Sequence, residues 1–277
     1  MINCSALVLT LNEEKNIKRC LQSLAWCDDI VVLDSFSTDE TQHIAREFGV
    51  RIYQRRFDNY ASQRNFGLHQ VKYKNDWVLM LDADEIVSEE LKEEIEKILR
   101  NTKSDNSMYR MRRKDHLFNK WIKHSSGYPT WFGRMVRPDM VTVKRAINEE
   151  YHTDGKVEYL TGHLLHYPFN KGISHWINKH NKYSSMEAEL LVNETISKIY
   201  IKDIWNFDPV VRRKALKKII YSLPGRPVLI FFALYILRMG ILDGKPGFIY
   251  CLLRAYYEFI INVKAKEIKR RNNGLSV

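Results

Sequence analysis

The chain has 277 residues, 45% of them hydrophobic and 12% aromatic, so it is long enough and apolar enough to bury a core. This composition excludes an intrinsically disordered chain. The net charge is +11, and all of the excess lies in residues 198–277, which hold 16 Lys and Arg against 5 Asp and Glu. The basic C-terminal segment predicts an anionic partner.

The four cysteines form no C-x-x-C pair. Their apolar surroundings predict reduced core thiols in a cytosolic protein and not a disulfide framework or a zinc site. The N-terminal stretch MINCSALVLTLNEE has no basic n-region, and its apolar run is too short for a signal peptide. We therefore expect a chain that stays in the cytoplasm.

Strand-like and helix-like patterns alternate over the first 100 residues. Short apolar runs predict strands at 4–10, 28–34, 50–56 and 76–82. Helical spacing of apolar residues predicts helices at 12–24, 39–49, 59–71 and 88–100. Continuous apolar strands that alternate with helices indicate a parallel sheet with both faces covered.

The pattern changes after residue 107. Short strands without intervening helices predict an antiparallel extension of the sheet over 108–167. Amphipathic patterns then predict long helices at 176–194 and 208–223.

The tail is apolar and basic at once. Val228 to Leu237 gives only ten apolar residues before Arg238, and a membrane span needs about 20. Residues 219–271 predict a helical pair that lies at an anionic membrane surface, and the alternative is a hairpin packed on the domain. The basic residues are mixed with bulky aliphatics and no binding motif appears, so we expect no nucleic acid.

Acidic and polar side chains follow three of the predicted strands. They are Thr10, Asn12, Glu13, Asp34, Asp82 and Asp84. In an open parallel sheet, ligands bind outside the carboxyl ends of the strands. Carboxylates gathered there repel one another unless a cation compensates. The pattern predicts a Mg²⁺ or Mn²⁺ ion shared with substrate phosphates.

A family resemblance rests on four segments in this order: LTLNEEKNIKRCLQSL, VVLDSFSTDET, ASQRNFGL and MLDADE. Together they resemble family 2 glycosyltransferases of the GT-A fold. The later segments WFGRMVRP, AINEEYH, HLLHY and WINKHNKYSSMEA extend the resemblance to about residue 190, and the tail is similar to the lipopolysaccharide-core glucosyltransferase branch often called WaaE-like or KdtX-like.

The resemblance implies an α/β fold with a Rossmann-like mixed sheet. It implies a catalytic domain at 1–197, with a nucleotide-sugar half at 1–100 and an acceptor half at 101–197. Residues 198–277 would form a basic amphipathic helical extension.

The resemblance also implies a donor site for a UDP-sugar, made by Thr10, Asn12, Glu13, Asp34, Arg64, Asp82, Ala83 and Asp84. Asp84 and His166 would hold the divalent cation. Many relatives carry Asp at the position of Ser35, which leaves the base contacts there less defined.

An inverting transferase needs a base for the acceptor hydroxyl. The resemblance points to Glu149 in AINEEYH, with Glu150 as second choice and Arg134 and Trp131 on the acceptor side. The histidines at 163, 166, 175 and 180 invite a zinc interpretation, but structural zinc sites usually contain Cys.

These observations favour an inverting, metal-dependent transferase that moves a hexose, with glucose favoured, from a UDP-sugar to a lipid-linked or lipopolysaccharide-core acceptor. We expect it on the cytoplasmic face of the plasma membrane. Two alternatives stay open: a haloacid-dehalogenase-type phosphatase that uses Asp82 and Asp84, and a non-catalytic membrane-associated scaffold of the same fold.

Overall fold

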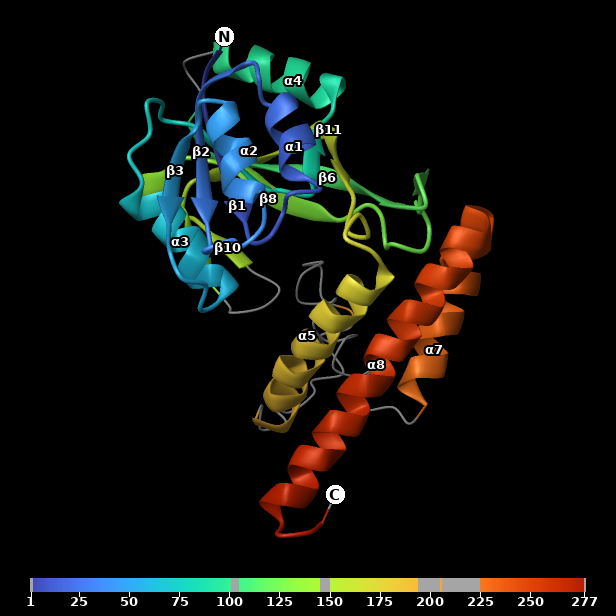
Figure 1. Ribbon diagram of the computed structural model, residues 1–277. Coiled ribbons are helices and arrows are strands. Elements are labelled where there is room, and N and C mark those ends of the chain that lie inside the picture. Colours follow the sequence, from blue (N-terminus) through green and yellow to red (C-terminus); the bar gives the residue numbers. More distant parts are fainter. Residues whose placement is uncertain (1, 101–104, 145–149, 194–204, 206–224, 277) are drawn as a thin grey trace. The chain divides into compact units, whose positions relative to one another are not determined.

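The computed structural model describes residues 2–100, 105–144, 150–193, 205 and 225–276 (Figure 1). The chain divides into two compact units, Met1–Trp121 with Tyr128–Lys171 (unit 1) and Ile122–Gly127 with Gly172–Val277 (unit 2). The predicted boundary between residues 197 and 198 lies outside the described residues. The division into a catalytic domain and an extension therefore stays a prediction.

Unit 1 is built around a nine-stranded sheet in the order β3-β2-β1-β4-β8-β6-β11-β5, with β7 paired to β6. Its strands are β1 (Ile2–Thr10), β2 (Cys27–Asp34), β3 (Arg51–Gln54), β4 (Val78–Asp82), β5 (Glu85–Val87), β6 (Asn106–Leu117), β7 (Lys120–Trp121), β8 (Trp131–Val136) and β11 (Lys156–His166). A separate antiparallel pair consists of β9 (Thr142–Lys144) and β10 (Glu150–His152).

The helices of unit 1 are α1 (Ile17–Gln22), α2 (Thr41–Glu47), α3 (Tyr60–Gln70) and α4 (Glu89–Arg100), with a short 3₁₀ turn η1 (Pro138–Met140). All four strands and all four helices predicted for the first 100 residues are present. The strands β3, β2, β1 and β4 pair in parallel, which confirms the predicted parallel sheet.

Two apolar layers cover the faces of this sheet. Along β1, side chains alternate between them, so that Val8 joins one layer and Leu7 the other. The first layer contains buried residues of α1, α2 and α4, and the second contains residues of α3 and β9 (Figure 1). A strand buried on both faces needs an unbroken apolar run, which is the pattern that the sequence carries.

The predicted antiparallel extension over 108–167 is only partly right. β8 is antiparallel to both β4 and β6, as expected. β11 is parallel to β6, with Lys156 opposite Asn106 and His166 opposite Asp115, so the prediction was wrong for this strand. The reason is that β9 and β10 intervene, and the chain re-enters the sheet at the amino end of β6. As a result β11 ends at the same edge as β1, β2 and β4.

Unit 2 contains α5 (Ile173–Asn193), α7 (Arg226–Phe232), the π-helical turn η3 (Ala233–Leu237), the 3₁₀ turn η4 (Gly240–Asp243) and α8 (Gly244–Asn272). α5 confirms the helix predicted at 176–194, and the helix predicted at 208–223 lies outside the described residues.

Several contacts join the described parts of unit 2. Ala188 of α5 packs on Ile261 and Ala265 of α8. Arg226 at the start of α7 is fully buried and pairs with Glu258 of α8. Asp243 accepts hydrogen bonds from the backbone N–H groups of His124 and Ser125 at 3.0 and 2.8 Å.

The tail keeps many apolar side chains exposed. Leu237 is 81% exposed, Leu242 60% and Val228 58%. No single described helix has the length and apolar composition to cross a membrane. The pair Arg226–Leu237 and Gly240–Asn272, bent by 72°, meets those criteria when taken together.

Candidate active site

Polar side chains meet at one edge of the unit 1 sheet. The carboxyl ends of β1 and β2 are in register, with Thr10 opposite Asp34, and Asp82 of β4 lies opposite Leu9. On the other side of β4, His166 of β11 lies opposite Asp115 of β6 and Glu85 of β5. Residues far apart in the sequence therefore reach one edge through strand register.

Asp34 is completely buried and accepts hydrogen bonds from its surroundings. Thr10 Oγ1 donates to it at 2.9 Å, Gln42 Nε2 at 2.9 Å and the backbone N–H of Ser37 at 2.9 Å. These bonds tie the loop after β2 to the end of β1. In this structure Asp34 orders the loop, and its predicted contact with the nucleotide stays a prediction.

Asn12 and Glu13 lie in the loop after β1. Asn12 has φ +55°, and its Oδ1 accepts from the backbone N–H of Thr38 at 2.8 Å. Asn and Asp tolerate this left-handed conformation better than most residues because their side chains bond locally. Glu13 pairs with Lys171 at 2.5 Å. Burial, together with the nearby charge of Asp84, raises the pKa of Glu13 above its ordinary value.

Two buried arginines hold the carboxylate of Asp82. Arg64 Nη2 lies 2.8 Å from Asp82 Oδ1, and Arg134 Nη2 lies 2.9 Å from Oδ2. Arg134 also pairs with the fully buried Glu85 at 2.8 Å. The charges of Asp82 and Glu85 are thus each compensated by a guanidinium, which reduces the repulsion between these two carboxylates.

Asp84 is the other carboxylate of the D-x-D segment, and it faces a histidine. His166 Nε2 lies 3.3 Å from Asp84 Oδ2, and its Nδ1 lies 2.7 Å from Asp115 Oδ1. Arg113 Nε in turn pairs with Asp115 at 3.0 Å. The imidazole is therefore fixed between two carboxylates, with Nε2 aimed at Asp84.

The charges around His166 act in opposite directions. Burial and the charge of Arg113 oppose protonation of the imidazole, but Asp84 and Asp115 outweigh them and raise the pKa of His166 to about 9. Burial raises the pKa of Asp115, but Arg113 and His166 outweigh it, so the net pKa is lowered. The two carboxylates thus favour the protonated imidazole of His166 at neutral pH.

The chemistry of this pair fits a divalent cation. Two ligands of an octahedral ion, each at about 2.1 Å from it, lie about 3 Å apart, close to the 3.3 Å between His166 Nε2 and Asp84 Oδ2. A carboxylate bonded to the other nitrogen is the usual support of a metal-bound histidine, and Asp115 supplies it. Within the described ranges no group of three or more His, Cys, Asp or Glu is placed to hold a metal.

The residues predicted on the acceptor side are placed only in part. Glu149, the predicted base, lies outside the described residues. Its neighbour Glu150 is on β10, where Tyr151 receives a hydrogen bond from Arg134 at 3.2 Å. Successive side chains of a strand point to opposite faces, so Glu150 points away from the Arg134 side. Trp131 opens β8, on the strand that also carries Arg134.

Four residues of this cluster were not predicted. Glu85, Arg113, Asp115 and Lys171 contribute ion pairs to it. A polar residue at the carboxyl end of a predicted strand was the available signal for Arg113 and Asp115. Nothing in the sequence marks Lys171, which reaches Glu13 only through the fold.

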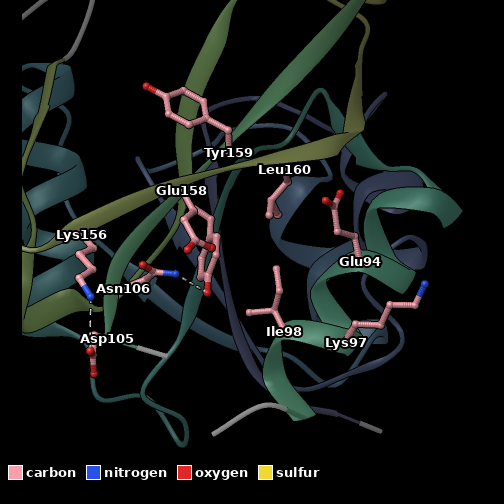
Figure 2. A pocket seen from close by; sticks show the side chains of 10 residues that line it. Glu94, Lys97, Ile98, Asp105, Asn106, Lys156, Glu158, Tyr159 and Leu160 are labelled. Atoms are coloured by element: carbon pink, nitrogen blue, oxygen red, sulfur yellow. Dashed lines mark hydrogen bonds and ion pairs between the residues drawn. The ribbon is translucent and has the colours of Figure 1, made fainter. Parts of the chain in front are cut away.

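A hollow of about 530 Å³ lies elsewhere in unit 1 (Figure 2). It is lined by the last turns of α4 and by the first residues of β6 and β11, including Lys97, Asn106 and Lys156. These are the amino ends of β6 and β11, so the hollow lies at the sheet edge opposite the carboxylate cluster. None of the predicted site residues lines it.

The fold and the site define a class of protein: an α/β protein with its candidate ligand site at the carboxyl ends of parallel strands and a D-x-D segment at its centre. The sequence pattern of "Glycosyl transferase family 2" matches residues 5–175. The chain belongs to this family and is a glycosyltransferase, which removes the phosphatase alternative.

Relatives extend the similarity along the chain. The uncharacterized glycosyltransferase RT0209 of Rickettsia typhi is 29% identical and covers 99% of this chain and 90% of its own. The lipopolysaccharide core biosynthesis glycosyltransferase LpsC of Rhizobium meliloti is 27% identical and covers 94% and 90%. Among solved structures, residues 1–349 of TarS from S. aureus align over 97% of this chain and 92% of that one, at 15% identity and a TM-score of 0.45.

Proposed function

We propose that the protein is an inverting, cation-dependent hexosyltransferase that uses a UDP-sugar, with glucose the favoured hexose, and a lipid-linked or lipopolysaccharide-core acceptor. The observation that carries the proposal is the pair of Asp84 and His166, 3.3 Å apart and backed by Asp115, within a family 2 chain. The similarity to LpsC over most of the chain supports an acceptor of the lipopolysaccharide-core kind.

The donor would lie along the carboxyl edge of β1, β2 and β4. Its nucleotide would lie near Thr10, Asn12, Glu13 and Asp34, and its diphosphate near Asp82, Ala83 and Asp84. Asp84 and His166 would hold Mg²⁺ or Mn²⁺, which when bound neutralises the charge that develops on the leaving diphosphate. Arg64 and Arg134 fix the carboxylate of Asp82 in place, because each donates to one of its oxygens.

The transfer itself needs one base. The acceptor hydroxyl gives its proton to a carboxylate, its oxygen bonds to the anomeric carbon, and the bond from that carbon to the diphosphate oxygen breaks with its electron pair on the diphosphate. A single displacement inverts the anomeric configuration. Glu149 is the proposed base, and Glu150 is the second choice.

The proposed location is the cytoplasmic face of the plasma membrane, with residues 219–271 at an anionic lipid surface. Two observations support this: the basic excess of the C-terminal segment and the exposed apolar side chains of Leu237, Leu242 and Val228. Apolar side chains flanked by Lys and Arg suit the boundary between headgroups and acyl chains. An enzyme held there meets a lipid-attached acceptor at high local concentration.

Thermal-shift titration of the purified protein tests the donor site. The ligands are UDP, UDP-glucose, UDP-galactose, UDP-N-acetylglucosamine and GDP-mannose, each with and without Mn²⁺. Binding to the folded state alone raises stability by about 2.7 kcal/mol at a hundred times Kd. We expect a Mn²⁺-dependent shift with one UDP-sugar, lost in Asp84→Ala.

Asp76→Ala is the matched control, because Asp76 lies two residues before β4, the strand that leads to Asp84, and its side chain is 88% exposed. That variant should keep the full shift. If the wild-type protein shifts with no nucleotide, the transferase proposal fails, and the chain is then a scaffold that has kept the family's fold.

A further inference from the structure

A second set of charged residues lies on β6, away from the carboxylate cluster. Arg110, Arg112 and Lys114 alternate along the strand with Met111 and Arg113, which face the core and Glu85. Alternate residues of a strand point to opposite faces. Arg110, Arg112 and Lys114 therefore share the other face of the sheet.

Aromatic rings lie beside two of these three cations. Arg112 Cζ lies 5.2 Å from the ring centroid of Trp131 and 5.9 Å from that of Tyr128. Arg110 Cζ lies 5.9 Å from the ring of Tyr159. We call Arg110, Arg112, Lys114, Tyr128, Trp131 and Tyr159 the basic–aromatic face.

The face is accessible and ordered by its own contacts. Tyr159 is 54% exposed, and its ring meets that of Trp131 edge-to-face at 4.9 Å. Tyr159 and Leu160 point to opposite sides of β11, and Leu160 points toward Ile98 of α4 (Figure 2). The exposed ring therefore belongs to the solvent side of the strand.

The positive charge of the face is not neutralised within the part of the chain that the structure describes. Arg64, Arg113 and Arg134 each pair with a carboxylate, but Arg110 and Arg112 have no such partner there. Arg112 Nη2 donates to the backbone carbonyl oxygen of Thr161, and the buried Nε atoms of Arg110 and Arg112, like that of Arg134, lack an acceptor. Buried donors without a partner call for an explanation.

Burial and the positive charge of the face together lower the pKa of a neighbouring histidine, His163. Burial, followed by the charges of Lys114 and Arg112, lowers the pKa of His163 to about 4. Glu90 and Glu94 act in the opposite direction on His163. Glu94 is already engaged, since it accepts from the backbone N–H groups of Thr161 and Gly162 at 2.9 and 2.8 Å.

We infer that the basic–aromatic face binds an anionic sugar of the acceptor, through Arg110 and Arg112 on its charge and the rings of Trp131 and Tyr159 on its apolar face. This rests on the proposed transferase function, since a transferase must hold an acceptor as well as a donor. Guanidinium groups pair with phosphate or carboxylate in planar geometry, and flat rings suit the C–H face of a pyranose. The anionic group is a phosphate or a carboxylate.

Ligand-observed NMR titrations test the inference with three sugars that share a ring: glucose 6-phosphate, glucuronate and glucose. Saturating UDP and Mn²⁺ are present to block the donor site. We expect glucose 6-phosphate, glucuronate or both to bind at least tenfold more tightly than glucose. Binding of the first alone assigns a phosphate, and binding of the second alone assigns a carboxylate.

The variants separate charge from stacking. Arg112→Gln should remove most of the preference for the charged sugars, and Tyr159→Ala should weaken all three. Arg46→Gln is the matched control, because Arg46 is an exposed arginine on α2 and should change nothing. Unchanged thermal melting establishes that each variant is folded.

The inference is overturned if the three sugars bind alike, if none binds, or if Arg112→Gln keeps the preference. It is also overturned if a single-stranded oligonucleotide binds the face more tightly than the charged sugars, because nucleic acid uses the same residue types. A failure of UDP to bind wild-type protein would instead defeat the proposed function. The two failures are therefore distinguishable.

Discussion

Replacing Asp115 by Asn should weaken cation binding without removing a proposed cation ligand. Asp115 Oδ1 lies 2.7 Å from His166 Nδ1 and 3.0 Å from Arg113 Nε. Asn keeps the size of the side chain but removes its charge, and its amide no longer strengthens the basicity of the imidazole. Loss of a partner of this kind lowers metal affinity by about 10- to 100-fold, which corresponds to about 1.4 to 2.8 kcal/mol.

Isothermal titration with Mn²⁺, in the presence and absence of UDP, measures the effect directly. The Kd for Mn²⁺ should rise by about 10- to 100-fold in Asp115→Asn and stay unchanged in Asp76→Asn, which alters an exposed carboxylate that precedes β4. Asp115→Asn also removes the charge partner of Arg113, which retains its ion pair with Glu85 at 3.5 Å. Thermal melting checks that the variant is still folded. A wild-type Mn²⁺ affinity in folded Asp115→Asn would refute the role assigned to the His166–Asp115 bond.

Three other predictions concern stability and membrane binding. Gly162→Ala places a Cβ 2.5 Å from Leu91 Cα and should lower the free energy of unfolding by about 1 to 3 kcal/mol in urea denaturation. Burial lowers the pKa of His180 to about 4 in the folded protein, whereas an exposed histidine has a pKa of about 6.5. As the pH falls below about 6.5, the unfolded state therefore binds a proton that the folded state does not, and the free energy of unfolding decreases. Between pH 7 and 5 the wild-type protein should lose about 1 to 2 kcal/mol more than His180→Phe, and equal losses would contradict this. Leu237→Asp should reduce sedimentation with anionic vesicles, whereas Phe48→Asp in unit 1 should not; equal binding of both would argue against the tail as the lipid contact.

Several features of this protein followed from its sequence. The unbroken apolar runs at 28–34 and 76–82 predicted strands buried on both faces, and β2 and β4 lie between two apolar layers. A strand formed by such a run has no polar side to expose to water, so it is stable only where both of its faces are buried. The same runs fixed which polar residues sit at strand ends, and so the place of Asp34, Asp82 and Asp84 was predictable. The order of the motifs identified the family.

Only the tertiary structure decided which charged partners lie beside the carboxylates at those strand ends. The parallel pairing of β11 with β6 places His166 opposite Asp115 and Glu85, and no local pattern encodes the direction in which a strand re-enters a sheet. Arg134 was predicted to serve the acceptor, but it is 3% exposed and pairs with Asp82 and Glu85. Residue type and spacing specify which groups a strand delivers, whereas the partner of each charge depends on which distant strands become neighbours.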